Sequence, residues 1–392
     1  MDWYGLTPAT ISTVYVDPIS GLDTNPGTEM LPFKTLRKSI HGVSVATTVF
    51  CKPGLYDRTT AFADANPLMT ALVLKVWGVG KVTSSMNYPG LVWSKTVGLA
   101  TTYEATIITV GAVADAGILT VAGDYSRYTL VASAAAVDAL PGSYYVTGTT
   151  VYVNRLDGSP PSGDQVRVYI NTRNFLYNVA DGVLWAQGFE FEGGNRPCQI
   201  AATLDVTKKS TAYLIDCSMK YSENVRSGLN TDAGTRTFLL RCTIAMNGAD
   251  GANYHYAVGS APPYALEEAC TSRYNGWTAT GTNNDSTMHD GGTIYRVGGT
   301  YFGGQDRVVH DINASWSFNV YCSAGGSRSV SPLTRVSWAA GTGATDASQM
   351  YLQNCSGNSD FNFRTEGTGA VIYYKDFTGA LTTVAGSTIT PY

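Results

Sequence analysis

This sequence contains few charged residues. Charged residues make up 14% of its 392 residues, whereas an average soluble protein carries roughly 25%. The 26 lysines and arginines nearly balance the 30 aspartates and glutamates, which leaves a net charge of −4. A nucleic-acid-binding protein would show a basic excess in a patch or stripe. We therefore expect no nucleic-acid partner.

Long apolar runs and a helix-forming composition are missing as well. No run approaches the ~18 consecutive apolar residues that a membrane span needs, and the first residues lack the pattern of a signal peptide. We expect no membrane insertion and no signal peptide. Gly (42 residues) and Tyr (25 residues) are abundant, and 44% of the chain is hydrophobic. This composition excludes intrinsic disorder and favours β-strands over long helices.

The cysteines form no CxxC pair, although there are seven of them. A zinc site or a dense disulfide framework is therefore not expected, and we predict no metal and no cofactor. The informative feature is a repeat of roughly 23–33 residues in which a cysteine or glycine recurs in a similar context. The repeated positions are Gly188, Cys217, Cys242, Cys270, Gly299, Cys322 and Cys355.

This repeat indicates a solenoid, in which each unit buries its apolar face only by stacking on its neighbours. Each unit consists of short alternating strands separated by Gly, Asn and Ser turns, without a helical period. A coil of about 22–30 residues built only from strands is typical of a parallel β-helix. We expect the cysteines to form a buried, inward-pointing stack, because a free buried cysteine behaves as a small hydrophobe.

The N-terminal segment carries a recognisable pattern at residues 15–28, 32–40 and 49–56, the last of which reads Val-Phe-Cys-Lys-Pro-Gly-Leu-Tyr. It resembles the first coil of right-handed parallel β-helix proteins of the pectate-lyase-like superfamily. The resemblance implies an all-β fold, a right-handed parallel β-helix with an N-terminal capping helix. Residues 35–41 contain the one convincing helix start. Such a helix would cover the apolar core and strand edges of the first coil.

Four parts of the chain are expected. Residues 1–57 would contain the first strand, the capping helix and the first coil, and residues 176–377 the regular coils. Residues 58–175 break the repeat, and we interpret them as a β-rich insertion, with irregular early coils as the alternative. Residues 378–392 would form a polar, β-compatible tail.

Three of the four histidines fall at comparable places in the repeat. His255, His289 and His310 lie roughly 10–15 residues before the repeated position, and Asp232 has a similar place one repeat earlier. Because adjacent β rungs are about 4.8 Å apart, we expect these groups in a column along one side of the solenoid. The alternative is a structural ladder whose polar side chains bind backbone turns.

Glycoside hydrolysis needs two carboxyl groups, about 5–5.5 Å apart for retention and about 6.5–9.5 Å apart for inversion. Carboxylates one or two rungs apart approach these spacings. Asp290 and Asp311, each directly after a histidine, are the preferred pair, with Asp250 as a third candidate. Glu223 opens a turn comparable to that of Asp250 and is predicted to bind substrate.

Elimination from a uronate-containing glycan is the competing chemistry. It needs a base near the acidic proton and a cation beside the carboxylate. His255 or His289 could be the base, with Arg307 or Arg273 as the cation. Sugar rings also stack on aromatic faces, so we expect Tyr254, Tyr274 and Trp277 to help bind the glycan. Core filling is the alternative for these aromatics. The loop 276–285 is the longest of the regular coils.

Three phrases, at residues 250–255, 286–291 and 308–316, are similar to β-helix proteins of phages and bacteria. The resemblance extends to tailspike-like depolymerases of bacteriophages. It implies a homotrimer in a virion tail or outside the cell that binds a bacterial surface polysaccharide. A non-catalytic receptor-binding fibre and a purely structural surface protein remain alternatives.

Overall fold

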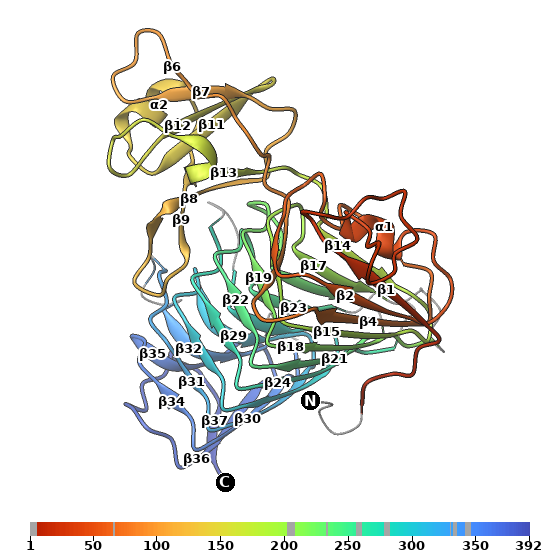
Figure 1. Cartoon of the computed structure of the whole chain (residues 1–392). Helices are drawn as coiled ribbons and strands as arrows, with labels where there is room; N and C mark the ends of the chain where they lie inside the picture. Colours follow the sequence, from red (N-terminus) through yellow and green to blue (C-terminus); the bar gives the residue numbers. More distant parts are fainter. Residues whose placement is uncertain are drawn as a thin grey trace.

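Three parallel sheets run the length of the molecule and wind into a right-handed parallel β-helix (Figure 1). The computed structural model describes residues 6–65, 67–201, 208–232, 234–255, 261–277, 283–329, 331, 335–341 and 346–392. Each full coil contributes one strand to each sheet, and we call the strands of neighbouring coils rungs. The all-β fold with a parallel β-helix, predicted from the repeat and from the N-terminal resemblance, is confirmed.

The sheets are numbered in the order in which a coil passes through them. Sheet 1 has 12 strands, sheet 2 has nine and sheet 3 has eight. Sheet 1 consists of β1 (Ser12–Val16), β2 (Thr47–Cys51), β4 (Ala71–Val76), β15 (Val183–Gln187), β18 (Thr211–Ile215), β21 (Arg236–Leu240), β24 (Tyr264–Glu268), β27 (Thr293–Val297), β30 (Trp316–Val320), β33 (Gln349–Gln353), β36 (Val371–Lys375) and β37 (Ile389–Pro391). Sheet 2 consists of β3 (Gly54–Tyr56), β5 (Val82–Ser85), β16 (Phe189–Glu192), β19 (Ser218–Lys220), β22 (Thr243–Ala245), β25 (Thr271–Arg273), β28 (Thr300–Phe302), β31 (Ser323–Gly325) and β34 (Ser356–Gly357). Sheet 3 consists of β14 (Phe175–Asn178), β17 (Cys198–Ala201), β20 (Leu229–Asp232), β23 (Ala252–Tyr254), β26 (Ser286–Met288), β29 (Arg307–Asp311), β32 (Val336–Ala340) and β35 (Phe361–Thr365).

The corner between sheets 1 and 2 explains the cysteine repeat. One residue in the left-handed conformation, such as Asp216 (φ 52°), turns the chain, and the next residue, Cys217, points inward. All seven cysteines are free and buried, so the predicted inward stack is confirmed. One alignment was wrong: Glu190 pairs with Ser218, so Phe189 and not Gly188 occupies the cysteine position. Gly188 (φ 76°) is the corner residue, where glycine avoids the strain of a positive φ.

The capping helix α1 (Leu36–Ile40) begins at Thr35, whose hydroxyl accepts a hydrogen bond from the Lys38 N–H at 3.0 Å. Leu36 and Ile40 are fully buried in the main core. The helix therefore covers the core of the first coils, as the sequence predicted, at the end of the stack away from the C-terminus (Figure 1).

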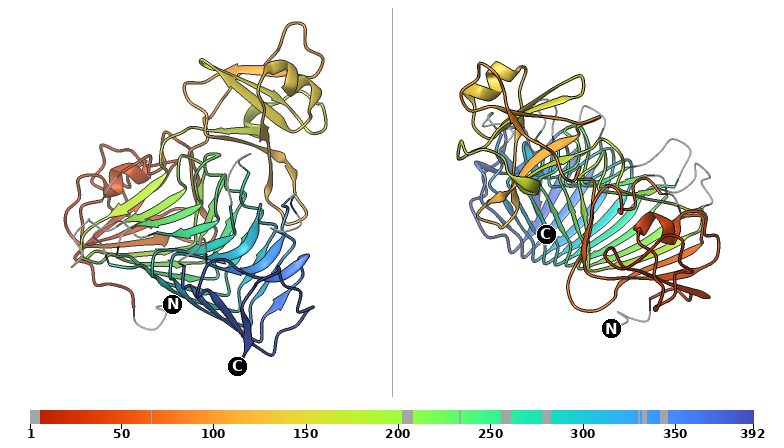
Figure 2. Two further views of the ribbon diagram at one scale, coloured as in Figure 1. Left: turned by 180° about the vertical axis from the view of Figure 1, so that it is seen from behind. Right: turned by 45° about the horizontal axis from the view of Figure 1, so that its top comes forward.

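The insertion forms a lobe beside the coils in Figure 1 and in the left view of Figure 2. It has its own apolar core and two small sheets, ordered β10-β11-β12-β7-β6 and β13-β8-β9. Its elements are β6 (Ser94–Lys95), β7 (Tyr103–Thr106), β8 (Ala112–Leu119), β9 (Tyr125–Arg127), β10 (Thr129–Leu130), α2 (Ala134–Ala139), β11 (Ser143–Thr147), β12 (Thr150–Asn154), the 3₁₀ turn Gly163–Gln165 and β13 (Val166–Tyr169). Two strands within the range 58–175, β4 and β5, belong to the coils and not to the insertion. In the C-terminal tail, β37 continues sheet 1.

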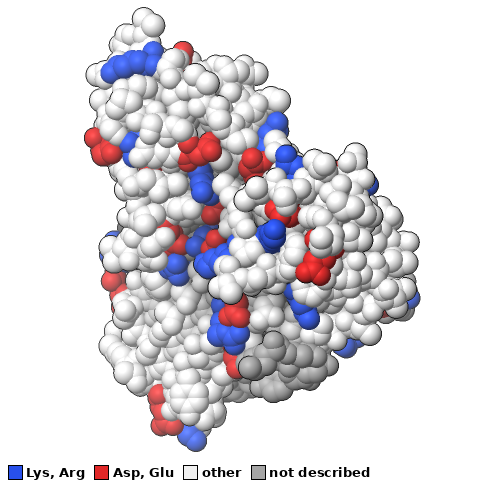
Figure 3. Space-filling view, viewed as in Figure 1, with Lys and Arg blue, Asp and Glu red and all other residues white. Residues whose placement is uncertain are grey.

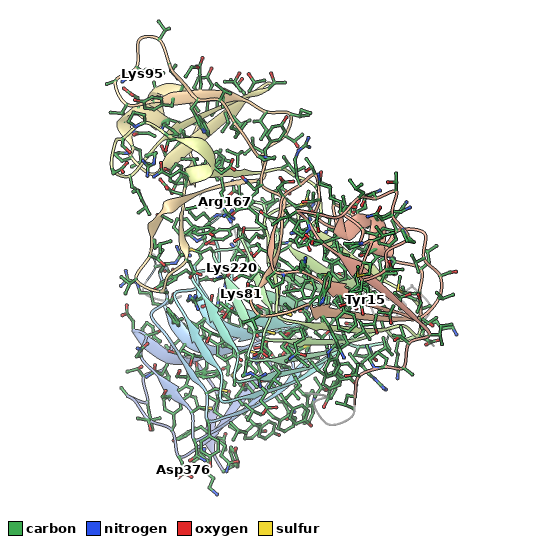
Figure 4. The ribbon with its side chains drawn as sticks, in the orientation of Figure 1. Tyr15, Lys81, Lys95, Arg167, Lys220 and Asp376 are labelled. Carbon is green, nitrogen blue, oxygen red and sulfur yellow. The ribbon has the colours of Figure 1, made fainter. Side chains whose placement is uncertain are left out.

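The insertion is fastened to the coils by ion pairs over the outer face of sheet 2. Arg167 of β13 binds Glu192 at 2.6 Å, and Asp124 at the start of the β9 hairpin strand binds Lys220 at 3.0 Å and Arg273 at 2.8 Å. In Figure 3 the charged side chains gather in a band below the lobe, and Figure 4 places Arg167 and Lys220 in this band. The charges of this region are therefore used to hold the two parts together.

Among the described residues, no helix has both the length and the apolar character that crossing a membrane requires.

Candidate functional site

The outer face of sheet 3 brings together most of the predicted column. Side chains alternate along each strand, so Leu229 and Thr231 point into the coil while Asn230 and Asp232 point outward. Asn230 pairs with Asn253 of the next rung, and Asn253 pairs with Thr287. The ladder continues past the strand ends, because the His255 N–H donates to the Thr231 carbonyl at 2.8 Å and the His289 N–H to the Tyr254 carbonyl at 3.1 Å.

Asp232, His255 and His289 therefore occupy equivalent positions on three successive rungs. We call this surface the outer polar face. It consists of Gln199, Asn230, Asp232, Asp250, Asn253, His255, Asn284, Thr287, His289 and Asp290.

The two histidines of this face are stacked. The rings of His255 and His289 are 4.1 Å apart with an interplanar angle of 21°. Burial, followed by the neighbouring His255 and His310, lowers the pKa of His289 to about 3, so its imidazole is neutral at neutral pH. Asp290 stands beside them, with Oδ2 3.6 Å from His255 Nδ1 and Oδ1 accepting a hydrogen bond from the Asn313 amide at 2.7 Å.

Several buried polar atoms of the face have no hydrogen-bond partner in the described structure. They are Gln199 Oε1, Asn230 Nδ2, Asn253 Oδ1, Asn284 Oδ1 and His289 Nε2. Leaving a buried donor or acceptor without a hydrogen bond costs about 1–3 kcal/mol of stability. Such groups are rare in folded proteins, and a cluster of them indicates a place where a ligand or water binds. Their position on neighbouring rungs makes a strip of donors and acceptors that can bind a polar ligand.

Asp250 lies at the edge of this strip and is only 7% exposed. Its Oδ1 accepts the Asn284 N–H at 2.7 Å and its Oδ2 accepts the Asn253 amide at 2.7 Å. Burial raises the pKa of Asp250 to about 7, against the lowering effect of these hydrogen bonds. A carboxyl group that holds a proton near neutral pH is suited to general-acid catalysis.

Asp311 does not lie on the outer polar face, so the predicted pair of Asp290 with Asp311 is wrong. Asp311 is fully buried inside the coil, where its two oxygens accept from Arg296 Nη1 and Nη2, both at 2.8 Å. The reason is the alternation along β29, in which Val309 and Asp311 point inward while His310 points outward.

Arg296 and Asp311 belong to a buried network that also contains Glu267. The Tyr254 hydroxyl donates to Glu267 Oε1 at 2.8 Å and the Tyr301 hydroxyl to Oε2 at 2.6 Å. Tyr254 is therefore part of the core, and the prediction that it binds substrate is wrong. The network separates two apolar clusters of the core, one that extends to Ile294 and one that begins at Tyr301.

The other predicted polar residues are engaged elsewhere. His310 is buried, its Nε2 lies 3.0 Å from the Gly341 carbonyl, and burial lowers its pKa to about 4. Arg307 forms ion pairs with Asp306 and Glu366. Arg273 lies on sheet 2 and binds Asp124 of the insertion.

Glu223 accepts hydrogen bonds from Asn171 at 2.9 Å and Asn195 at 2.7 Å, in the turn before β20. Glu223 is half-buried and lies in the turn between sheets 2 and 3, so it is not part of the predicted column of histidines and aspartates.

The predicted aromatic residues pack against protein. Trp277 donates from Nε1 to the Tyr274 carbonyl at 2.8 Å, and the Arg328 guanidinium lies 5.0 Å from its ring centre. Tyr274 makes an edge contact with Phe302, 5.1 Å between ring centres. Residues 278–282 of the loop 276–285 lie outside the described residues.

An aromatic column on the outer face of sheet 1 was not predicted. It includes the stacked pairs Tyr213–Phe238, Tyr295–Phe318 and Tyr351–Tyr373, with ring centres 4.9, 5.0 and 4.6 Å apart. Because the ring faces cover one another, mainly ring edges point outward. This column is a less suitable platform for sugar stacking, which uses the faces of aromatic rings.

Sequence reasoning missed the amides of the outer polar face. Asn230 and Asn253 each stand two residues before a member of the column, Asp232 and His255. Along a strand, residues two apart share a face. The spacing to Asp232 and His255 was therefore the signal that could have found them.

Residues 19–81 match the family described as a protein of unknown function, DUF1565. None of the curated protein sequences matches the chain. Among solved structures, XylC in complex with xylose is 10% identical with a TM-score of 0.52, over 92% of this chain and 68% of that one. A glycoside hydrolase is 8% identical with a TM-score of 0.44, over 94% and 96% of the two chains.

Pectate lyase Pel9A is 10% identical with a TM-score of 0.45, over 97% of this chain and 78% of that one. At such identities the likeness concerns the fold and not the activity. The chain has the parallel β-helix fold that its repeat and its N-terminal segment predicted.

Proposed function

We propose that this chain binds a polysaccharide across the outer polar face of sheet 3 and cleaves it by hydrolysis. The observation that carries the proposal is the strip of buried polar atoms on neighbouring rungs that have no partner among the described residues, with a carboxyl group of raised pKa at its edge. The hydroxyl groups of a glycan both donate and accept hydrogen bonds, and the side-chain amides of Asn230 and Asn253 can do the same in return.

Asp250 is the proposed general acid, which protonates the oxygen of the leaving sugar. Asp232 and Asp290 are the remaining carboxylates of the face, and one of them would complete the acid pair in place of Asp311. The similar fold of XylC, which was solved with xylose, supports a sugar as the class of substrate.

β-Elimination is the second candidate, because Asp290 lies beside His255 Nδ1 and could orient this imidazole as a base. Two observations favour hydrolysis. The arginines predicted to neutralise a uronate, Arg307 and Arg273, are held in ion pairs. The low pKa of His289 makes its imidazole a weak base.

The resemblance of residues 250–255, 286–291 and 308–316 to phage tailspikes supports a bacterial surface polysaccharide as the partner. As part of the same proposal, the chain is a homotrimer in a virion tail or outside the cell. Light scattering would test this by giving three times the 41.7 kDa of one chain. A monomer mass at micromolar concentration would contradict it.

Digestion of bacterial surface polysaccharides, followed by mass analysis of the products, tests the activity. Hydrolysis adds water to each product, whereas elimination leaves an unsaturated uronate that absorbs in the ultraviolet. We expect Asp250→Asn to lower the rate by about 10²–10⁴-fold, the usual contribution of a general acid.

Asp376→Asn is the matched control, because Asp376 is exposed at the last corner of the coils (Figure 4). Equal rates in the two variants would contradict the assignment of Asp250. Binding without any shortening of the polymer would identify a receptor-binding protein instead.

A further inference from the structure

We propose that His255, His289 and Asp290 bind a divalent transition-metal ion at the end of the outer polar face. Each of the three side chains offers one ligand atom, and these atoms lie within 4.8 Å of one another. No other group of three histidine, cysteine or acidic side chains with this geometry occurs among the described residues. The absence of a CxxC pair had predicted no metal, but these ligands come from two neighbouring rungs.

The fold itself brings the two imidazoles together. His255 and His289 directly follow β23 and β26, which are adjacent in sheet 3, and their backbone N–H groups continue the same ladder. Neighbouring rungs are about 4.8 Å apart, which places both rings on one side of the coil. Asp290 follows His289 and turns its carboxylate back toward His255.

The contact between Asp290 and His255 inside the cluster is loose. The 3.6 Å between Asp290 Oδ2 and His255 Nδ1 is longer than a normal hydrogen bond. His289 Nε2 is buried and has no hydrogen-bond partner in the described structure. This unpartnered nitrogen is an observation independent of the clustering, and it points to a ligand.

Asn313 orients Asp290 by a hydrogen bond, as residues next to metal ligands commonly do. Its side-chain amide donates to Asp290 Oδ1 at 2.7 Å. Metal-binding carboxylates are usually held by such hydrogen bonds, and their loss typically costs 10–100-fold in affinity.

The donor set indicates which ions fit. Two imidazoles and one carboxylate suit Zn²⁺, Co²⁺ or Fe²⁺, whereas Ca²⁺ and Mg²⁺ prefer oxygen ligands alone. Bonds of about 2.0 Å in a tetrahedron require ligand atoms roughly 3.3 Å apart. The stacked rings would have to fan apart slightly, and His255, which is 39% exposed, has room to turn.

Three protein ligands leave one position open, and this position would face the same surface that we propose to bind glycan. The metal proposal does not depend on the glycan proposal, because ion binding is measured without any sugar.

Calorimetric titration of the full chain with ZnCl₂ tests the site, after chelator treatment and in the absence of a histidine tag. We expect one equivalent of Zn²⁺ to bind. His255→Ala should weaken this binding by more than about 100-fold, and Asn313→Ala by about 10-fold or more. His41→Ala is the matched control, since His41 is exposed at the end of α1.

Circular dichroism melting shows whether His255→Ala is folded, and the visible spectrum of the Co²⁺-loaded chain reports the coordination directly. If a variant does not fold, anomalous scattering from Zn²⁺ in crystals of the unchanged chain locates the ion. Uptake that does not saturate, equal affinity in His255→Ala and His41→Ala, or an anomalous peak elsewhere would each overturn the proposal.

Discussion

The interior of the coil and the outer face of sheet 3 carry polar groups of opposite kinds. In the interior, Glu267 and Arg296 of sheet 1 and Asp311 of sheet 3 are buried and satisfy one another with the help of two tyrosine hydroxyls. On the outer face, Asn230, Asn253 and their neighbours are also buried, but five of their polar atoms have no partner in the described structure. His310 and Asp311 are adjacent in sequence and lie on opposite sides of this division.

The comparison shows that burial alone does not mark a functional polar residue. A network whose members are all hydrogen-bonded is part of the protein's interior structure. A strip of buried groups without partners costs stability, and this cost is offset only when a ligand binds. The interior network therefore serves the fold, and the outer polar face of sheet 3 is the candidate site.

Arg296→Met should have the largest effect on stability. It leaves the Asp311 carboxylate without its cation in the core, and breaking a buried ion pair in this way typically costs 3–5 kcal/mol. Unfolding by urea would measure the loss. The control is Arg241→Met, because Arg241 also binds an aspartate, Asp216, through two hydrogen bonds of 2.7 Å, but the two side chains are 43% and 42% exposed.

An exposed pair is worth about 0–1 kcal/mol. If Arg296→Met and Arg241→Met destabilise the chain equally, the inner network does not have the role that we assign to it.

Asp250→Asn should change how stability depends on pH. The folded pKa of Asp250 is raised to about 7, above the value of 3.8 typical of an unfolded aspartate. The carboxyl group thus favours the fold while protonated, and this contribution is lost as the pH rises from about 4 to about 7. The variant lacks this loss, so at pH 8 it should be more stable than the unchanged chain.

A difference of one unit between the folded and unfolded pKa corresponds to about 1.4 kcal/mol. We therefore expect Asp250→Asn to raise the free energy of unfolding at pH 8 by an amount on the order of 2–4 kcal/mol. The vacant Asn253 Oδ1 can accept from the new amide if the Asn253 side chain flips. Urea unfolding at pH 4 and pH 8 would measure the difference. A variant that loses stability at pH 8 would show that the fold does not disfavour the ionised form of Asp250, and would contradict its raised pKa.

Asn230→Ala should have the smallest effect on stability and a selective effect on binding. Asn230 is 6% exposed and its Nδ2 has no partner among the described residues, so its removal should leave stability unchanged or slightly higher. Loss of one hydrogen bond to a sugar should lower glycan affinity by about 5–20-fold, or roughly 1–2 kcal/mol. Calorimetric titration with the oligosaccharide products would measure the glycan affinity of the unchanged chain and of Asn230→Ala.

Thr271→Ala, on the outer face of sheet 2, is the control, since it removes a polar side chain from the coil surface away from the strip. Lower affinity in Thr271→Ala than in Asn230→Ala would place the glycan on the wrong sheet for our account.

The sequence was sufficient for the fold but not for the acid pair. The cysteine spacing and the N-terminal segment predict stacked β coils because they reflect the corner geometry and the cap, which are local. The two His-Asp dipeptides look equivalent, but β26 ends at Met288, before His289, whereas β29 continues to Asp311. Met288 accepts from the Ile312 N–H, so His289 stands opposite Ile312 and not opposite His310.

This register differs by two residues from an alignment of the dipeptides, so both histidines still point outward, whereas Asp290 lies in a left-handed corner (φ 58°) and Asp311 lies within β29 and points inward. Such a shift depends on loop lengths, which vary between coils. For this reason Asp311 could not be assigned to the core from spacing alone. Tyr254, one residue before His255, could have been assigned to the core by the alternation of side chains along a strand. The outer amides would have been accessible to the same reasoning, once the strands were in register.

The most direct test of the outer polar face is a crystal structure of the chain with an oligosaccharide released by its own digestion. Our account predicts sugar across β20, β23 and β26, with hydroxyl groups in hydrogen-bond distance of Asn230 Nδ2 and Asn253 Oδ1. Sugar bound instead along the aromatic column of sheet 1, or between the insertion and sheet 2, would contradict it.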